Sequence, residues 1–188
     1  MKDISLHLLD IIQNSIVAFC TKITVSVNVD TQKDRLSVTV TDNGAGMDEE
    51  LLAAVLDPFT TTRTTRKVGL GLPLLMDSAR LAGGHLAVNS QKNAGTEVEA
   101  SFKITHIDRI PLGDLAETLV MVLVANPVME IELILGNKEE NFRFNSFEVR
   151  DQLGDVPITS FSVVEWIRDY INEGVKLIFG GVLNEVVS

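Results

Sequence analysis

Several features are scarce in this chain, and each scarcity excludes a class of protein. The 188 residues contain one cysteine, Cys20, so no disulfide framework forms within the chain. The most apolar run, Leu119 to Ala125, is far too short to span a bilayer. Neither an internal repeat nor a low-complexity stretch occurs. The apolar fraction of 45% is ordinary for a folded protein, so we expect a globular chain with a reduced, buried thiol.

Basic residues are also scarce, and the imbalance is uneven along the chain. The net charge is -10, and residues 1–105 contribute 10 basic and 12 acidic groups, whereas residues 106–188 contribute 6 and 14. Because binding to nucleic acid or to an anionic membrane requires clustered Lys and Arg, we expect neither and predict a protein partner instead. Met1-Lys2-Asp3 leads directly into an amphipathic helix. We therefore expect no signal peptide and a cytoplasmic location.

Hydrophobic spacing in residues 1–105 predicts an α+β fold. Two strands are expected to join through a polar turn, two more through Asn93-Ala94-Gly95, and Gly83-Gly84 should end a helix. We therefore expect a two-layer α/β sandwich, with a mixed, mostly antiparallel sheet and helices on one face. The expected helices are Asp3–Phe19, Asp48–Val55 (capped by Asp48) and Leu72–Ala82, and the strands are Ile23–Val29, Arg35–Thr41, His85–Ser90 and Thr96–Ile104.

Residues 106–188 are predicted to form a small α-β-β-α segment, a C-terminal regulatory or interaction domain. Pro111 should open a helix to Ala125, and Ser162-Val163-Val164-Glu165 is a capping box for a helix to Ile178. Met129–Leu135 and Phe142–Val149 should form a hairpin. This hairpin extends a sheet, pairs across a homodimer, or packs as a small core on the first domain, and the last alternative is favoured.

Asp10 and Asn14 are the first candidate site residues. Their spacing of four places both side chains on one face of the predicted helix. An amide oxygen is a hard ligand that suits Mg²⁺, which completes its octahedron with phosphate and water. The alternative is an ordinary polar pair on a helix surface.

A second candidate group surrounds Asp42, at the end of a predicted strand. Its carboxylate can accept a hydrogen bond from the exocyclic amine of adenine, where guanine has a carbonyl. Gly44 and Gly46 leave room for the purine and allow positive φ, and Met47 can pack on the base. Taken alone, Asp-x-Gly-x-Gly is more often a plain turn.

A third group follows in Thr60–Val68, a Thr-rich loop with the cations Arg63, Arg66 and Lys67. A triphosphate is an obvious partner for these charges, although a solvated loop is the simpler alternative. Gly69 and Gly71 then lead into a helix N-terminus, which favours phosphate. No Walker A sequence occurs in the chain.

These groups, in this order, resemble the GHKL nucleotide-binding domain of gyrase B, the Hsp90 chaperones, sensor histidine kinases and MutL. The sequence is most similar to sensor histidine kinases in Pro58-Phe59, in Gly-Leu-Gly-Leu at 69–72 and in Gly83-Gly84-His85-Leu86. The resemblance covers residues 4–104. The resemblance implies ATP and Mg²⁺ as cofactors. Residues expected to bind them are Asn14, Asp42, Gly44, Gly46, Met47, Phe59, Thr62, Arg63, Arg66, Lys67, Gly69, Leu70, Gly71, Leu72 and Thr96.

The resemblance also implies individual roles. Asn14 corresponds to the only protein ligand of the metal, and Thr96 corresponds to a threonine that supports the adenine-binding Asp42 through water. Asp10 stands where the ATPases of the family have a Glu that activates water. The shorter side chain argues against efficient hydrolysis, because a general base must reach its proton within hydrogen-bond distance.

Three functions follow from this pattern and stay open at the sequence level. The first is a protein kinase that acts in trans on a partner, since nine residues before Asp10 are too few for the phosphoacceptor hairpin of a sensor histidine kinase. The others are an ATPase or ATP-operated switch, and a nucleotide sensor without turnover. The segment His106-Ile107-Asp108-Arg109-Ile110-Pro111 loosely resembles the sequence of a phosphoacceptor helix. A linker is the favoured interpretation of that segment.

Overall fold

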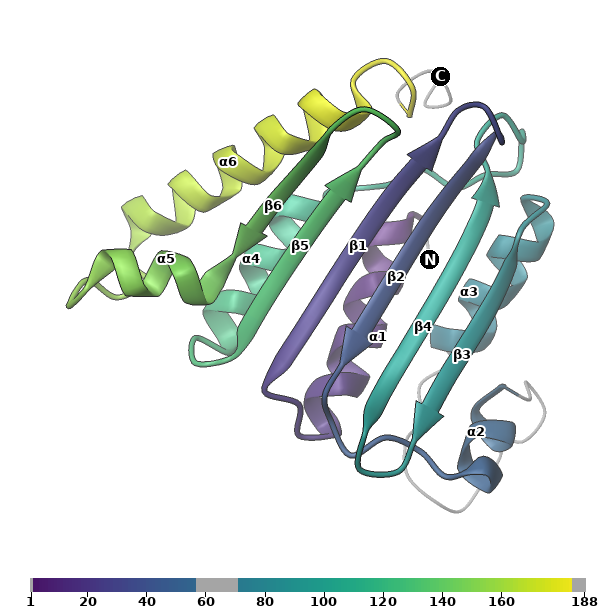
Figure 1. The fold of residues 1–188 in the computed structure, drawn as a ribbon, viewed down its shortest axis with the longest axis horizontal. Coiled ribbons are helices and arrows are strands. Elements are labelled where there is room, and N and C mark those ends of the chain that lie inside the picture. The colour runs from purple at the N-terminus through teal and green to yellow at the C-terminus, as the bar shows by residue number, and fades with distance from the viewer. Residues whose placement is uncertain (1, 57–70, 184–188) are drawn as a thin grey trace.

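The computed structural model describes residues 2–56 and 71–183 and has one six-stranded sheet at its centre. The strand order is β3-β4-β2-β1-β5-β6, and every neighbouring pair is antiparallel except β1 and β5 (Figure 1). The strands are β1 (Lys22–Asp30), β2 (Arg35–Asp42), β3 (His85–Gln91), β4 (Gly95–Lys103), β5 (Glu130–Gly136) and β6 (Asn141–Asn145).

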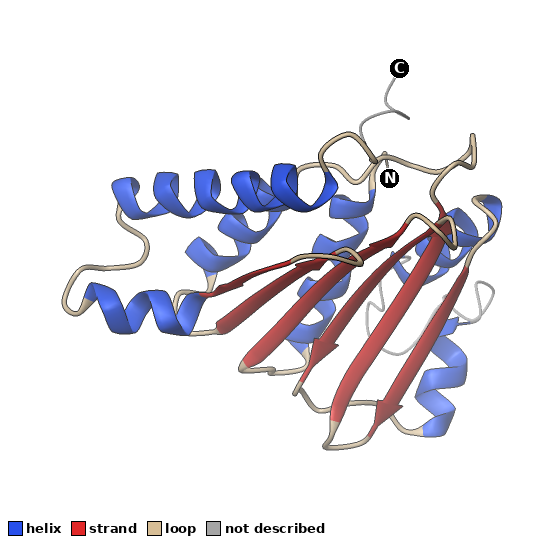
Figure 2. Ribbon diagram, turned by 45° about the horizontal axis from the view of Figure 1, so that its top comes forward, coloured by secondary structure: helices blue, strands red, loops and turns tan. Residues whose placement is uncertain are grey.

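Helices form the second layer, on one face of the sheet (Figure 2). The helices are α1 (Ile4–Val17), α2 (Glu49–Leu56), α3 (Gly71–Leu81), α4 (Leu115–Ala125), α5 (Ser146–Leu153) and α6 (Phe161–Phe179). Alternation in the strands explains this one-sided arrangement, because Ile23, Val25 and Val27 of β1 are fully buried whereas Thr24 and Ser26 between them are half-buried. The α+β sandwich expected from the sequence, with a mixed, mostly antiparallel sheet, is confirmed.

The C-terminal residues continue the same sheet. Strand β5 pairs in parallel with β1, with Ile131 opposite Ile23 and Leu133 opposite Val25. A parallel neighbour requires a crossover, and α4 supplies it on the helical face. The hairpin of residues 106–188 therefore extends the sheet of residues 1–105, and both parts contribute to one hydrophobic core. A regulatory or interaction role for residues 106–188 stays a prediction.

Two boundaries in the C-terminal part differ from the sequence expectation, and one helix was not expected. Helix α4 begins at Leu115 after the cap Asp114, and not at Pro111. The carbonyl of Pro111 instead accepts a hydrogen bond from the Ile4 amide at 2.9 Å, at the free N-terminal turn of α1. Strand β6 stops at Asn145, whose side chain caps the unexpected helix α5.

The other helix limits lie close to those expected. The Asp48 carboxylate accepts a hydrogen bond from the Leu51 amide at the start of α2, as predicted, and Asp3 caps α1. Helix α6 begins at Phe161 after Ser160, whose side chain makes no capping hydrogen bond, and Ser162 lies inside the helix, so the expected capping box is wrong. None of the helices within the described ranges is both long and apolar enough to cross a bilayer.

The shared core predicts that both parts unfold together. Ile23 on β1 is 0% exposed, so Ile23→Ala should lower the free energy of unfolding by about 2–5 kcal/mol. The only tryptophan, Trp166, lies far away on α6 and reports on the C-terminal part. In urea, the fluorescence transition of Trp166 should move to lower denaturant together with the far-UV circular dichroism transition.

Ser26→Ala, on the polar face of the same strand, is the matched control and should leave the midpoint nearly unchanged. A fluorescence midpoint that stays in place while the dichroism transition moves would contradict a single cooperative unit.

Candidate nucleotide-binding site

The Asp42 carboxylate lies at the end of β2 and is 9% exposed. It accepts hydrogen bonds from the Ser15 hydroxyl at 2.6 Å and from the Gly44 amide at 2.8 Å, one on each oxygen. These contacts fix the carboxylate and leave lone pairs for a third donor, because an ionised carboxylate has about four acceptor positions. The group therefore suits recognition of an amine.

Ser15 is a site residue that the sequence analysis missed. Its position on the apolar stripe of α1 suggested only a core residue, and it is indeed 4% exposed. Its hydroxyl also lies 3.2 Å from the Ile11 carbonyl, one turn earlier. The available signal was chemical, since a buried hydroxyl on an apolar helix face needs a hydrogen-bond partner.

The segment from Gly44 to Met47 packs closely against neighbouring backbone. The Ala45 amide donates to the Ala18 carbonyl at 2.9 Å, which ties the segment to the end of α1. Gly46 has φ of +61°, and a Cβ atom there would lie 2.0 Å from the Gln91 carbonyl oxygen. Only glycine fits that position, so Gly46 shapes the loop through its backbone.

Thr96 lies opposite Asp42 in the β2–β4 register. Its hydroxyl is 2.8 Å from the Ser90 hydroxyl, which in turn accepts a hydrogen bond from the Met47 amide at 2.8 Å. Met47 is half-buried against the core. The β3–β4 hairpin thus holds Met47 and Thr96 beside Asp42, and Ser90 is a second residue that the sequence analysis missed.

Asp10 and Asn14 are both half-buried on α1, as the helical spacing requires. A Cβ atom at Gly71 would lie 3.0 Å from the Cβ of Asp10, so the first residue of α3 packs directly on Asp10. The Asp10 carboxylate is therefore next to the start of a helix, where backbone amides favour an anion, and Asn14 lies one turn further along α1.

This donor set fits a magnesium ion that is bound mainly through phosphate. Among residues 2–56 and 71–183 no cluster of three His, Cys, Asp or Glu could hold a metal ion by itself. Mg²⁺ with nucleotide commonly takes one or two protein oxygens and completes its shell with phosphate and water. The Asn14 amide oxygen matches that requirement.

The remaining expected site residues divide into two groups. Leu72 lies in the hydrophobic core at 6% exposed, so its side chain packs within the protein. The others lie outside the described residues, namely Phe59, Thr62, Arg63, Arg66, Lys67, Gly69 and Leu70.

His7 is buried beside the site, at 1% exposed. Its Nε2 is 3.5 Å from the Ser78 hydroxyl on α3, and its Nδ1 has no hydrogen-bond partner among the residues described. Burial lowers the pKa of His7, while the carboxylates of Asp10 and Asp3 act in the opposite direction. The imidazole is therefore neutral in the folded protein at pH 7.

Cys20 lies near Asp42, and burial together with that negative charge raises the pKa of the thiol to about 11. Its Sγ is 3.8 Å from the Met129 sulfur. A thiol that stays protonated at neutral pH is a poor nucleophile, so Cys20 is a packing residue. Cys20 is half-buried, and not fully buried as expected from the sequence, and its reduced state stays a prediction.

His106 lies in the loop between β4 and α4, and its ring packs near Gly83. Gly83 follows one end of α3, whereas Gly71 at the other end contacts Asp10. A helix of 11 residues is about 16 Å long. His106 is therefore far from the candidate phosphate position, in a loop and not on a helix, as the linker interpretation expected.

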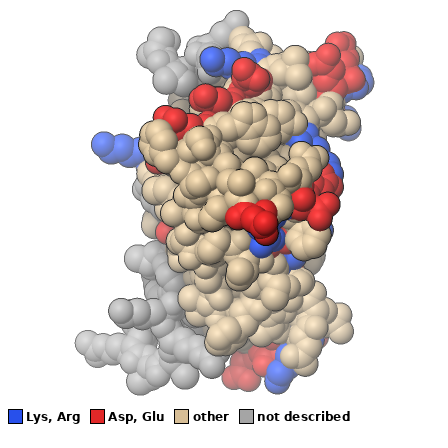
Figure 3. Space-filling model, turned by 90° about the vertical axis from the view of Figure 1, so that its left-hand side faces the viewer, with Lys and Arg blue, Asp and Glu red and all other residues tan. Residues whose placement is uncertain are grey.

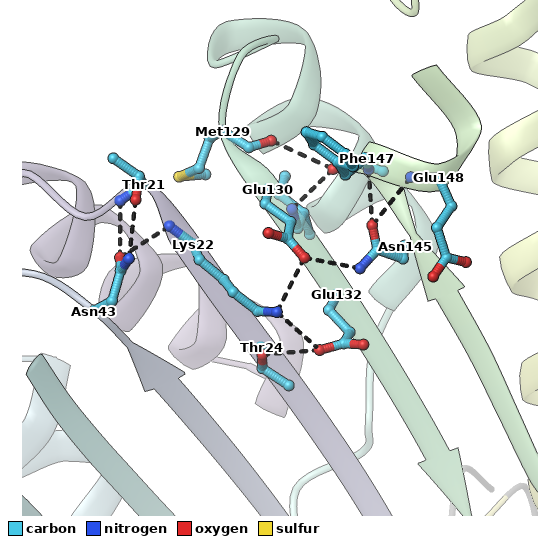
Figure 4. A network of polar contacts seen from close by, with 12 residues as sticks. Thr21, Lys22, Thr24, Asn43, Met129, Glu130, Glu132, Asn145, Phe147 and Glu148 are labelled. Atoms are coloured by element: carbon cyan, nitrogen blue, oxygen red, sulfur yellow. Dashed lines mark hydrogen bonds and ion pairs between the residues drawn. The ribbon is translucent and has the colours of Figure 1, made fainter. Parts of the chain in front are cut away.

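A polar network connects the loop after Asp42 to α5 (Figure 4). The Asn43 side chain accepts a hydrogen bond from the Lys22 amide at 2.9 Å, and the Lys22 ammonium binds Glu130 at 3.0 Å. Asn145, the cap of α5, donates to the same Glu130 oxygen at 2.9 Å. These bonds from Asn145 and Lys22 lower the pKa of Glu130. The partly exposed ion pair contributes less than about 1 kcal/mol, so the network fixes geometry more than stability.

The first part of the chain is similar in sequence to known proteins. A family model described as "Histidine kinase-, DNA gyrase B-, and HSP90-like ATPase" matches residues 2–106. The sensor histidine kinase YvrG of Bacillus subtilis is 34% identical over 83 residues, which are 42% of this chain and 14% of that protein. The heme sensor protein HssS of Staphylococcus saprophyticus is 32% identical over 95 residues, or 50% of this chain and 21% of that protein.

A structural comparison gives the Aquifex aeolicus MutL ATPase domain complexed with ADP. It has a TM-score of 0.46 and 16% identity, and covers 77% of this chain and 64% of that one. The chain matches only a minor part of the length of the two curated sensor proteins.

The neutral, buried His7 predicts a loss of stability in acid. Because the folded pKa lies below the unfolded value near 6.5, protonation favours the unfolded chain. Its contribution is fully present above about pH 6.5 and falls below it, with a slope of at most about 1.4 kcal/mol per pH unit. Urea unfolding at several pH values should show this slope for the wild type and a shallower slope for His7→Gln.

His106→Gln, which changes a more exposed imidazole, should keep the wild-type slope. If both variants follow the wild type between pH 7 and 5, the burial of His7 as a neutral group is wrong.

Proposed function

Because the chain belongs to the family of histidine kinase-, DNA gyrase B- and HSP90-like ATPases, we propose that it binds Mg-ATP and transfers the γ-phosphoryl group to a partner protein. The observation that carries this proposal is the nearly buried Asp42 carboxylate, held by Ser15 and Gly44 with acceptor capacity to spare. A cytoplasmic regulatory protein is the setting that agrees with one free, unreactive thiol.

Base selection rests on the chemistry of Asp42. A carboxylate accepts from the 6-amino group of adenine and repels the 6-oxo group of guanine. Met47, whose amide donates to Ser90 next to Thr96, offers an apolar surface to a base. The Asp42 carboxylate and the Met47 side chain together favour an adenine nucleotide.

The groups proposed to bind phosphate are Asn14 and the start of α3. The Asn14 amide oxygen would hold Mg²⁺, which neutralises phosphate charge when bound, and the amides at the start of α3 would face the phosphates. Arg63, Arg66 and Lys67 would supply positive charge. Phosphoryl transfer requires mainly positioning and charge stabilisation from the protein, and these groups provide both.

The position of His106 supports an acceptor on another molecule. One length of α3, about 16 Å, separates it from Asp10, and direct transfer needs reacting atoms within about 3–3.5 Å. The same chain therefore cannot present His106 to its own nucleotide without unfolding the loop. A partner protein meets the requirement more simply.

A second candidate function is an ATP-operated switch without efficient turnover. It is favoured by Asp10, which stands where the hydrolysing relatives have a longer Glu and packs against Gly71. A base that contacts the start of α3 has little freedom to reach a water molecule. In this alternative ATP or ADP binding controls a partner without phosphorylation.

The adenine assignment predicts the effect of Asp42→Asn. The substitution replaces one acceptor oxygen of the carboxylate with an N–H₂ donor. That donor would face another donor, either the Gly44 amide, the Ser15 hydroxyl or the adenine amine, so one favourable contact of Asp42 becomes repulsive. Calorimetry should show ADP affinity reduced about 100-fold or more, with the preference for ADP over GDP largely lost. Asp108→Asn, in the exposed loop near His106, should bind ADP normally. Unchanged ADP affinity in Asp42→Asn would place the base elsewhere.

The reaction is tested with γ-labelled ATP and Mg²⁺, following both protein-bound label and free phosphate. We expect nucleotide binding without labelling of His106, and Asn14→Ala should lose at least about tenfold of the Mg²⁺-dependent affinity, or ~1.4 kcal/mol. Phosphate release without labelled protein would select the ATPase. Acid-labile label that disappears in His106→Ala would overturn the assignment of an external acceptor.

A further inference from the structure

We propose that one side of α6 is a docking surface for a basic, amphipathic helix of a partner protein. The surface consists of Trp166, Tyr170 and Leu177, which we call the α6 stripe. It lies on the C-terminal part of the chain, and the proposal does not depend on the nucleotide chemistry proposed above.

The α6 stripe is apolar and exposed. With 3.6 residues per turn, its three positions fall in one narrow sector of the helix, beside the sector that buries Ile167 and Ile171 in the core. Trp166 is 51%, Tyr170 36% and Leu177 63% exposed. Figure 3 shows this side of the molecule as a largely uncharged surface, with acidic and basic side chains around it and one charged group within it.

The composition of the stripe is more informative than its polarity. The chain has one tryptophan and one tyrosine in 188 residues, and both lie here. Their rings are stacked, with centroids 5.3 Å apart and an interplanar angle of 12°. Tryptophan and tyrosine are the residues most enriched among those that dominate binding energy at protein interfaces.

The stripe is held rigidly before any partner binds. The Tyr170 ring also packs on Phe142 of β6, with centroids 4.8 Å apart. Gly174 allows this close approach, because a Cβ atom there would lie 2.6 Å from the Phe142 ring. A preorganised aromatic surface binds without a large ordering cost.

Charge identifies the partner. Glu165, Asp169 and Glu173 follow one another at intervals of four along α6, forming an acidic row immediately beside the stripe. Of the two basic residues of the helix, Arg168 is engaged by Glu117 at 2.8 Å, and Lys176 lies three positions after Glu173 on the side of the acidic row, so carboxylates outnumber ammonium groups three to one beside the stripe. An apolar stripe bordered by carboxylates complements a helix whose apolar face is bordered by Lys and Arg.

The same charges argue against other occupants. Two copies of this chain would bring two acidic rows together across a symmetric contact, and each copy has a net charge of -10. An anionic lipid surface would be repelled for the same reason. A basic protein segment is the occupant that the surface favours.

The test uses two synthetic, tryptophan-free helical peptides of about 18 residues, or five turns. Both have the same leucine-rich apolar face, and their polar faces carry Lys in one and Glu in the other. Trp166 reports contact directly because it is the only tryptophan. The Lys peptide should shift Trp166 emission to shorter wavelength and bind at least about tenfold more tightly than the Glu peptide.

Two variants locate the surface. Leu177→Ser should weaken binding of the Lys peptide about tenfold, and the double variant Asp169→Asn, Glu173→Gln should weaken it several-fold and flatten its salt dependence. Val128→Ser is the matched control, since Val128 is 85% exposed in the loop before β5 and should change nothing. Leu177→Ser should also leave ADP affinity unchanged, which separates this proposal from the nucleotide site.

Equal binding of both peptides, binding that leaves Trp166 emission unshifted, or no binding of either would overturn the proposal. Sedimentation velocity provides an independent check. A dimer that dissociates in Leu177→Ser would assign the stripe to a second copy of the chain and reject a basic partner.

Discussion

The parallel pairing of β1 with β5 is the interaction on which the rest of this structure depends. It makes β1 an interior strand, with β2 on its other side, so its backbone groups are paired along both edges. The alternating apolar residues of β1 and β5 all point to the helical face. The pairing therefore also joins the helices of residues 1–105 and those of residues 106–188 over one core. A sequence that divides by composition at residue 105 therefore folds as one continuous layer.

This continuity explains how the site is held. Asp42 ends β2, which lies next to β1, and the loop that follows is fastened to α1 by the Ala45 amide and to β1 by Asn43. The carboxylate is thus fixed by elements that the sheet already positions, and not by the loop alone. Rigid support of this kind is what a base-recognition group needs, since a displacement of about 1 Å costs much of a directional hydrogen bond.

Local signals in the sequence were sufficient for most of the fold. Alternation identified β1 and β2, and the side-chain cap Asp48 identified the start of α2, because these patterns act over a few residues. The errors occurred where contacts between residues far apart in the sequence decide where an element begins or ends. Pro111 accepts a hydrogen bond from the first turn of α1 across more than 100 residues, and Asn145 ends β6 by capping α5 although apolar residues recur after it at Phe147 and Val149.

The candidate site shows the same division. Asp10, Asn14 and Asp42 were found because their residue types and spacing carry chemical meaning in one dimension. Ser15 was missed because its contact with Asp42 spans 27 positions, and no periodicity identifies the acceptor of a buried hydroxyl. Ser90 was missed for a similar reason, since its role depends on the hairpin that brings it to Met47 and Thr96.

The sheet also relates the two proposed surfaces to each other. Strand β6, which supports Tyr170 through Phe142, is three strand spacings from β2, or about 14 Å. A helix docked on the α6 stripe would therefore not touch the nucleotide, but a folded domain attached to that helix would be wide enough to reach it. Docking at one end of a rigid sheet and chemistry at the other would let the acidic C-terminal half select the partner, while the nucleotide half acts on whatever is presented. Such a division would agree with the position of His106, which lies a helix length from Asp10.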